Sequence, residues 1–315
     1  MDIIKYNIKY VPQAQGMTNL GNTCYLNSLL QCLLSCSSMC ETLNDLATNH
    51  RNTKSWNSLT AALYSLYQNA LNNKDLTESC KRIWIIIMSI SAKRADRVKL
   101  SYGQQDVNEG LNMLFDAFDL IMPIKRLFQH AHIINIECKD CNQVVLSKRE
   151  VNCVFEVQPD LKTEQLPDFK ERDPYYNKPQ DFNTFLYKQN GYVTGYKCTK
   201  CGSKNDKFKS TNISMLPEIM VVLIKKYNSK NLTIFPKQLK FIRSGNKKMC
   251  LYDLIAQSEH SGGMGGGHYT AICKRNSEDS PVWKLLNDSY VSDANPGPTH
   301  NSYVIFYHYI GEFDI

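Results

Sequence analysis

Two different spacings of apolar residues divide the chain near residue 125. Before that point apolar positions recur with the period of an amphipathic helix, most clearly in Trp56–Leu71 and Val107–Phe118. From Leu127 onward apolar positions alternate with polar ones, as in Leu232–Phe241, and this alternation is typical of strands. Because the helical and the strand-rich parts are separated along the chain, we expect an α+β fold.

Composition narrows the class of protein. The 315 residues are 43% hydrophobic, enough to bury a substantial core in one large domain or two. The longest apolar run, Ile83–Met88, indicates a buried helical segment and is far shorter than the roughly 20 residues of a membrane span. The segment Gln158–Asp181, rich in Pro, Asp, Lys and Glu, predicts an exposed loop. The first residues, Met1–Lys5, do not have the pattern of a signal peptide.

A candidate nucleophile lies at the start of a predicted helix. The short run Gly21–Thr23 ends in Cys24, and an apolar helical pattern follows at once, at Leu26, Leu29, Leu30, Leu33 and Leu34. At a helix N-terminus the dipole and the free backbone N–H groups favour a thiolate, the form of cysteine that attacks carbonyl groups. A free cysteine is more commonly an inert buried thiol, so Cys24 needs a partner to count as catalytic.

That partner stands much later in the chain. The glycine-rich run 261–267 leads into His268 and a strand pattern, and a second strand pattern ends in Asn287 and Asp288. An imidazole can take the proton of a thiol, and an amide or carboxylate acceptor fixes the tautomer and orientation of the ring. An early cysteine followed by a late histidine and a late Asn or Asp is one order found in thiol proteases. His260 precedes the glycines, and we prefer His268 because it begins the strand.

A second cysteine pattern is independent of Cys24. Two Cys-x-x-Cys knuckles supply four thiols, at Cys138, Cys141, Cys198 and Cys201. Two such knuckles, each flanked by strand patterns, are what a tetrahedral zinc ion requires, although two unrelated pairs or a redox dithiol remain alternatives. Cys32, Cys36 and Cys40 recur every four residues, and we interpret them as thiols on a buried helix face rather than as another metal site.

Taken together, these segments resemble the catalytic domain of the ubiquitin-specific proteases. The resemblance runs in family order from about residue 16 to 309 and lies in the Cys box Gly16–Ser28, the Gln-Gln-Asp segment Gly103–Glu109, the His box Gly265–Ala271 with Trp283–Val291, and the closing strand Tyr303–Tyr307. One departure is Gly110, which stands where the family usually has a bulky apolar residue.

The resemblance implies a papain-like α+β fold with three subdomains in one catalytic domain, 1–315. We expect a helical thumb over about 16–125, β-rich fingers over about 126–225 and a palm carrying the His box over about 226–310. The active site would lie between thumb and palm. The four knuckle cysteines would hold a structural zinc ribbon in the fingers, since a site closed by four thiolates leaves no position for a reactive water.

The resemblance also implies a role for each candidate residue. The catalytic set comprises the nucleophile Cys24, the base His268, its partner Asn287 or Asp288, and the oxyanion donor Asn19, whose alternative is a turn residue. The backbone N–H of Cys24 would be a second oxyanion donor. Contacts to the substrate tail are expected from Gln104, Asp106, Glu109, Gly266, Gly267 and Tyr269. The acidic residues match the arginines of a ubiquitin tail, and the glycine run would close over its Gly-Gly end. Acidic residues are also common at helix N-termini without any binding role.

The function implied is that of a deubiquitinating cysteine protease that forms a Cys24 thioester. Its partners would be ubiquitin and ubiquitinated proteins, and we expect a monomer in the reducing cytoplasm or nucleus, without a membrane or a specific nucleic acid. An inactive ubiquitin-binding member and a protease for another Gly-Gly-tailed modifier are the alternatives. The net charge of +7 and the basic run Lys225–Lys248 also allow a zinc-ribbon protein that binds nucleic acid, but lysines on a solvated sheet edge explain that run better.

Overall fold

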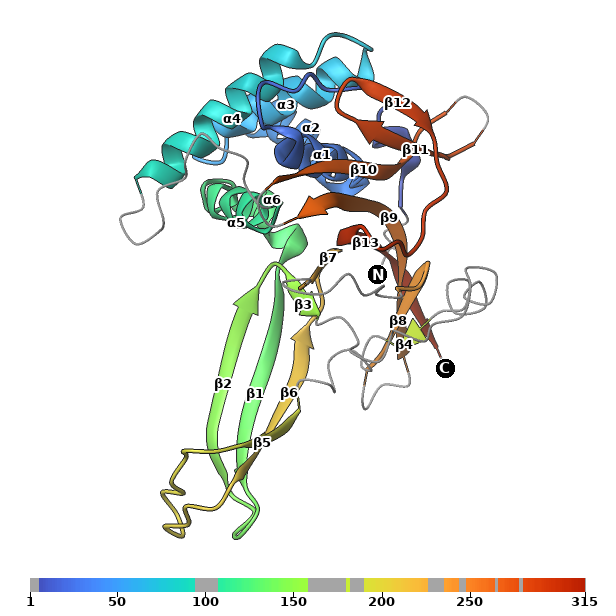
Figure 1. Cartoon of the computed structure of the whole chain (residues 1–315). Coiled ribbons are helices and arrows are strands. Elements are labelled where there is room, and N and C mark those ends of the chain that lie inside the picture. Colours follow the sequence, from blue (N-terminus) through green and yellow to red (C-terminus); the bar gives the residue numbers. More distant parts are fainter. Residues whose placement is uncertain are drawn as a thin grey trace.

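Helices occupy the first part of the chain and strands the rest, so the α+β prediction is confirmed. The structure, a computed structural model, describes residues 6–93, 107–157, 180–181, 190–225, 235–243, 248–263, 266–277 and 280–314. The helices are η1 (Ile8–Tyr10), α1 (Cys24–Leu34), α2 (Ser37–Asn49), α3 (Ser58–Leu71), α4 (Thr77–Ala92), α5 (Val107–Ala117), η2 (Phe118–Leu120) and α6 (Met122–Phe128). They gather at one end of the molecule, which we call the thumb (Figure 1).

The strands form two sheets. They are β1 (His130–Cys138), β2 (Val144–Asn152), β3 (Phe155–Val157), β4 (Gln180–Asp181), β5 (Gly191–Val193), β6 (Lys207–Met215), β7 (Ile219–Ile224), β8 (Gln238–Arg243), β9 (Lys248–Gly263), β10 (Gly266–Arg275), β11 (Val282–Asn287), β12 (Tyr290–Asp293) and β13 (Ser302–Asp314). A four-stranded sheet of order β2-β1-β6-β5, the fingers, extends away from the helices (Figure 1). The nine-stranded sheet, the palm, has the order β12-β11-β10-β9-β13-β7-β3, with β8 on β9 and β4 on β8.

The position of β7 between two hydrophobic cores explains why its sequence is apolar at every position. Its residues Ile219, Val221 and Leu223 join the core between helices and palm, whereas Met220, Val222 and Ile224 join a second core on the other face. Successive side chains of a strand point to opposite faces, so a strand covered on both faces needs an uninterrupted apolar run. The palm is therefore buried on both faces at β7, which pairs with β13.

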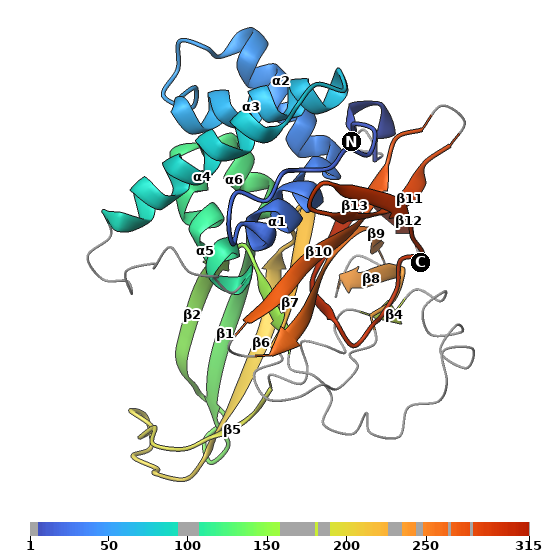
Figure 2. The same ribbon diagram turned by 45° about the horizontal axis from the view of Figure 1, so that its top comes forward.

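The thumb rests on the palm through α1. In Figure 2 this helix lies against β10, the strand that begins just before His268. Every residue of α1 is buried, including the polar Asn27, Ser28 and Gln31. Helix α1 is thus an internal helix, and its N-terminus and the start of β10 belong to the same packed unit.

The structure describes two of the predicted segments only in part. Of the strand predicted over Leu232–Phe241, residues 232–234 lie outside the described residues, and β8 begins at Gln238, after Pro236, which lacks an N–H group and cannot donate to a ladder. Most of the loop predicted over Gln158–Asp181 lies outside the described residues. Among the residues that the structure does describe, no helix is both long and apolar enough to cross a membrane.

Candidate active site

A tightly folded loop leads into Cys24, which is the first residue of α1 as the sequence predicts. The side-chain oxygen of Asn19 accepts hydrogen bonds from the backbone N–H groups of Gly21, at 3.0 Å, and Thr23, at 3.2 Å. Gly21 and Asn22 have φ of 93° and 56°, a left-handed conformation that glycine and asparagine tolerate best. The loop therefore owes its shape to short residues and to the Asn19 side chain.

The environment of Cys24 differs from the sequence expectation. Burial raises the pKa of the Cys24 thiol, and the nearby Asp288 carboxylate raises it further. The backbone of Tyr269 hydrogen-bonds to the sulfur and acts in the opposite direction, as do the backbone groups at the helix start. We expected the helix N-terminus to favour the thiolate, but the residue is only 3% exposed and desolvation outweighs the helix.

His268 and Asn287 meet across the neighbouring strands β10 and β11. The imidazole Nε2 lies 2.6 Å from the side-chain oxygen of Asn287. An amide oxygen only accepts, so the ring must carry a proton on Nε2, and Nδ1 is then the nitrogen that can receive one. The contact between Tyr269 and the Cys24 sulfur brings the same stretch of β10 to the candidate nucleophile.

Asp288 faces the loop before α1 and not the imidazole. Its carboxylate accepts hydrogen bonds from the side-chain amides of Asn19, at 2.9 Å, and Asn27, at 2.8 Å. Its backbone carbonyl accepts from the N–H of Met17 at 2.8 Å. Asp288 itself has φ of 47°, in the turn between β11 and β12. Of the two residues that the sequence offered as partners for His268, the structure brings Asn287 to the ring.

The residues expected to contact a substrate tail are only partly described. Gln104 and Asp106 lie outside the described residues, and Glu109 lies in the first turn of α5. Tyr269 is buried, and its ring stacks on that of His260 with centroids 4.5 Å apart and 23° between the planes. Gly266 and Gly267 begin β10. A Cβ atom at Gly267 would stand 2.1 Å from His260 Nε2, so this position has no room for a side chain.

Gly110 has a steric explanation. A Cβ atom at this position of α5 would lie 2.6 Å from the Cδ2 atom of Tyr25 and 3.3 Å from a methyl carbon of Leu29. The tyrosine ring on α1 therefore fills the space that a bulky apolar side chain would otherwise take. The departure from the family pattern is local, and α5 still packs on α1.

The four knuckle cysteines converge at the tip of the fingers. Their Sγ atoms all lie within 4.8 Å of one another, with Cys138 and Cys201 3.8 Å apart and Cys141 and Cys198 3.7 Å apart. Four thiolates around a tetrahedral zinc ion, each at ~2.3 Å, stand ~3.8 Å apart, so this donor set fits zinc. Within the described part of the chain it is the one group of metal-ligating side chains with such spacing. Cys32, Cys36 and Cys40 are buried thiols, as expected, but the prediction that they share one helix face is wrong. Cys32 lies in α1, Cys40 lies in α2, and Cys36 is the residue before α2.

The arrangement of these segments agrees with a comparison to known families. The model of the ubiquitin carboxyl-terminal hydrolase family matches residues 15–307, nearly the whole chain. The chain belongs to this family. The resemblance read from the sequence is therefore confirmed.

Hydrolases of this family give both sequence and structural matches. Ubiquitin carboxyl-terminal hydrolase 8 of Saccharomyces cerevisiae is 23% identical over 347 residues, covering 93% of this chain and 70% of the relative. Hydrolase 2 of Bos taurus is 24% identical and covers 96% of this chain, and hydrolase 15 of Rattus norvegicus is 34% identical over 35% of it. The chain spans 56% of the bovine hydrolase and 13% of the rat one.

A solved SAGA DUB module with Ubp8, Sgf11, Sus1 and Sgf73 bound to monoubiquitin has the same fold. It superposes with a TM-score of 0.70 at 18% sequence identity, over 96% of this chain and 70% of the other. A second structure of such a module, bound to ubiquitin aldehyde, has a TM-score of 0.67.

Sequence reasoning missed two residues of these sites. Asn27 reaches the Asp288 carboxylate from the second turn of α1, and Asp140 links the two cysteine knuckles. Asn27 is a polar residue in a mostly apolar helix, and Asp140 is a polar residue between two cysteines of the candidate zinc site. Their partners come from distant segments, so only the polarity of the position could have drawn attention to them.

Proposed function

We propose that the chain is a deubiquitinating cysteine protease, which hydrolyses the peptide or isopeptide bond after the C-terminal glycine of ubiquitin. The observation that carries this proposal is that α1, β10 and β11 bring three candidate catalytic residues together. Cys24 begins α1, the backbone of Tyr269 hydrogen-bonds to its sulfur, and His268 bonds to Asn287. Family membership supports the substrate class, and the relatives' names describe the same hydrolysis.

In the first step the Cys24 sulfur attacks the carbonyl carbon of the terminal glycine. His268 accepts the thiol proton on Nδ1, since Nε2 is used in the bond to Asn287. As the tetrahedral intermediate collapses, the imidazolium gives that proton to the leaving amine, and ubiquitin remains attached to Cys24 as a thioester. Because burial raises the pKa of Cys24, the free enzyme favours the thiol, and proton transfer to His268 accompanies attack.

In the second step water hydrolyses the thioester. His268 takes a proton from the water, hydroxide adds to the carbonyl, and the Cys24 sulfur leaves and recovers a proton from the imidazolium. We assign stabilisation of the oxyanion to the loop before α1. Asn19 and the backbone N–H of Cys24 are the donors, and Asp288 orients the Asn19 amide. Asn19 shapes the loop through its side-chain oxygen and would act on the oxyanion through its side-chain NH2 group, so the two roles are compatible.

The ubiquitin tail would run between thumb and palm toward Cys24. Tyr269, Gly266 and Gly267 would line the narrow end, and at Gly267 the neighbouring His260 leaves no room for a side chain. Gln104, Asp106 and Glu109 would bind the polar and basic part of the tail, as the family resemblance implies. The assignment of ubiquitin as the substrate has two alternatives. The chain could be an inactive member that only binds ubiquitin, or a protease for another Gly-Gly-tailed modifier.

We further propose that the cysteine cluster of the fingers holds a structural zinc ion. The ligands would be Cys138, Cys141, Cys198 and Cys201, whose sulfur spacing fits a tetrathiolate. When bound, zinc supplies a cross-link that holds the two knuckles together and takes no part in hydrolysis. A site with thiolate ligands and a thiol nucleophile suits a reducing compartment, and we propose that the chain acts there as a monomer on ubiquitinated proteins.

A ubiquitin derivative with a C-terminal electrophile tests the proposal. Intact-mass spectrometry should detect one ubiquitin adduct on the wild-type chain and no adduct on Cys24→Ser. Cys80→Ser is the matched control, because it removes a buried thiol of α4 and should leave the adduct intact. Folded protein that binds ubiquitin without reacting would indicate an inactive member. Reaction with another Gly-Gly modifier in place of ubiquitin would change the substrate.

A further inference from the structure

The second histidine near the glycine run, His260, lies directly beside the strand of His268. It belongs to β9, and the register of the two strands sets it opposite Tyr269 of β10, the residue that follows His268. Successive side chains of a strand point to opposite faces, and paired residues of neighbouring strands share a face. His260 therefore lies on the face of β10 to which positions 267 and 269 belong, one on each side of His268.

The His260 ring packs flat on the Tyr269 ring. The two centroids lie 4.5 Å apart, and the planes make an angle of 23°. Aromatic rings attract each other in such stacked arrangements, and each ring limits the movement of the other. Tyr269 is 3% exposed, and its backbone hydrogen-bonds to the Cys24 sulfur. The stack therefore holds the residue through which β10 reaches the nucleophile.

The edge of the same ring lies against the backbone of Gly267. A Cβ atom at this position would stand 2.1 Å from His260 Nε2 and 2.9 Å from His260 Cδ2. The ring thus occupies the space that any side chain at position 267 would need. A glycine within a strand often marks a place where another group comes close to the backbone, and here that group is the imidazole of His260.

His260 is itself held in place from the side of β13. Its backbone N–H donates to the carbonyl of Asn301 at 2.7 Å, and the Tyr303 ring lies with its centroid 6.1 Å from that of His260. The preceding residue, Glu259, is 7% exposed and accepts a hydrogen bond from Ser302 Oγ at 2.8 Å. This part of β9 is therefore a fixed support on which the start of β10 can rest.

The start of β10 needs such a support because of its composition. The strand begins with Gly266 and Gly267, and His268 follows at once. Pairing with β9 engages the backbone of these residues, but a glycine has no side chain to pack and more conformational freedom than any other residue. Contacts from a neighbouring side chain can supply the restraint that the glycines do not supply themselves.

We propose that His260 is a positioning residue for His268. Its ring contacts the residue before and the residue after the catalytic histidine, and in this way it fixes the imidazole of His268 relative to Cys24. No bond forms or breaks at His260. The kinetic consequence of this role rests on the proposed hydrolase function, whereas its structural consequence rests only on the packing of β9 against β10.

Leucine at position 260 tests the role, because it replaces the flat ring with an apolar side chain that cannot stack. Hydrolysis of a ubiquitin C-terminal fluorogenic amide by the full chain should show kcat lowered by about tenfold or more in His260→Leu, since a displaced catalytic group loses the benefit of its orientation. Urea unfolding establishes that the variant is folded. A kcat equal to that of the wild type would overturn the proposal.

Tyr309→Leu is the matched control. Tyr309 is also a half-buried ring of the palm, and it contacts the ring of Tyr252 across β13 and β9 at a centroid distance of 5.5 Å. The control therefore removes a ring contact that involves the same strand β9 but a different part of it, and kcat should stay at the wild-type value. Equal losses of kcat in His260→Leu and Tyr309→Leu would overturn the proposal, because they would reflect weaker packing in general.

A double-mutant cycle isolates the contact with Gly267. Gly267→Ala puts a methyl group into the space of the His260 ring and should lower kcat. In the His260→Ala background two of the three closest atoms are gone, and the Ser261 carbonyl oxygen at 2.9 Å remains. The loss of kcat caused by Gly267→Ala should therefore be smaller in that background by about threefold or more. Losses that simply multiply would overturn the proposal.

A measurement without substrate separates this inference from the proposed function. The Nε2–H of His268, bonded to Asn287 at 2.6 Å, should give a downfield proton NMR resonance that is absent from Asn287→Ala. This resonance should be lost or shifted in His260→Leu and unchanged in Tyr309→Leu. If the wild-type chain does not hydrolyse ubiquitin conjugates, the proposed function fails and this comparison still decides the role of His260. An unchanged resonance in His260→Leu would overturn that role.

Discussion

The side-chain amide of Asn19 donates a 2.9 Å hydrogen bond to the carboxylate of Asp288, 269 residues later in the chain. The bond joins the loop that delivers Cys24 to the turn that follows Asn287. Asn27 donates to the other carboxylate oxygen at 2.8 Å, so Asp288 holds two amides of the thumb at once. The residue that follows the histidine partner is thus a support for the loop before α1.

Replacing Asp288 by Asn should weaken this support. An amide offers one acceptor oxygen in place of two, and its NH2 group would face the NH2 group of Asn19 or Asn27. We expect kcat to fall by about 10- to 100-fold, in line with the loss of a hydrogen bond to a charged group, while KM changes little. Steady-state hydrolysis of a ubiquitin C-terminal fluorogenic amide measures both constants. Asp293→Asn is the control, because that side chain is 90% exposed and pairs with Lys284 at the surface.

Asn287 should act through the orientation of His268. Asn287→Ala removes the acceptor 2.6 Å from Nε2, and we expect kcat to fall by about 100-fold because the ring loses its fixed tautomer. Asn287→Asp keeps an acceptor at the same place and should retain most of the activity. Equal losses in the two variants would show that the amide does something other than accept this bond.

Much of the candidate site could be predicted from the sequence. Cys24, His268 and Asn287 could be identified from their residue types, from their positions at the ends of predicted helices and strands, and from their order along the chain. The knuckle cysteines are marked by spacing alone. The roles of Asn27 and Asp288 could not be read in the same way, since each depends on a partner from the other end of the chain. The raised pKa of Cys24 was missed for a related reason. Local sequence indicates a helix N-terminus, but desolvation depends on everything that packs against it.

Asp140 should control how firmly the knuckles hold zinc. It lies between Cys138 and Cys141, and its carboxylate accepts hydrogen bonds from Ser203 and Asn205 beside the other knuckle. Asp140→Asn should weaken zinc binding by about 10- to 100-fold, the usual effect of losing a group that supports metal ligands. Competition with a chromogenic chelator measures the affinity. Asp206→Asn, an exposed neutralisation in the same region, should leave it unchanged.

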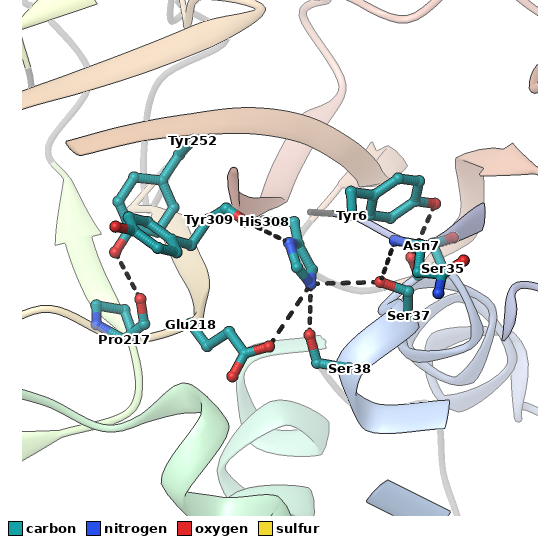
Figure 3. Close-up of polar contacts among 10 residues, drawn as sticks. All are labelled: Tyr6, Asn7, Ser35, Ser37, Ser38, Pro217, Glu218, Tyr252, His308 and Tyr309. Carbon is teal, nitrogen blue, oxygen red and sulfur yellow. Dashed lines mark hydrogen bonds and ion pairs between the residues drawn. The ribbon is translucent and has the colours of Figure 1, made fainter. Parts of the chain in front are cut away.

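His308 gives the structure a sensitivity to acid. The side chain is 0% exposed, its Nδ1 donates to the Tyr309 carbonyl at 2.7 Å, and its Nε2 accepts from Ser38 at 2.5 Å (Figure 3). Ser37 and Glu218 approach the same Nε2 atom, so the group does not have the relay geometry of a catalytic triad, in which the carboxylate bonds to the other nitrogen. Its role is to fill a polar interior between α2 and β13.

Burial lowers the pKa of His308 to about 4 from the ordinary 6.5. The unfolded chain then binds more protons than the folded one between these values, so stability is complete above about 6.5 and is lost as the pH falls toward 4. The full loss from this residue corresponds to about 3 kcal/mol. In urea unfolding at several pH values, His308→Gln should reduce the slope of stability against pH, although His130, whose pKa is lowered to about 3, contributes in the same direction. His50→Gln on the surface should preserve the wild-type slope, and an equal slope in His308→Gln would contradict this account.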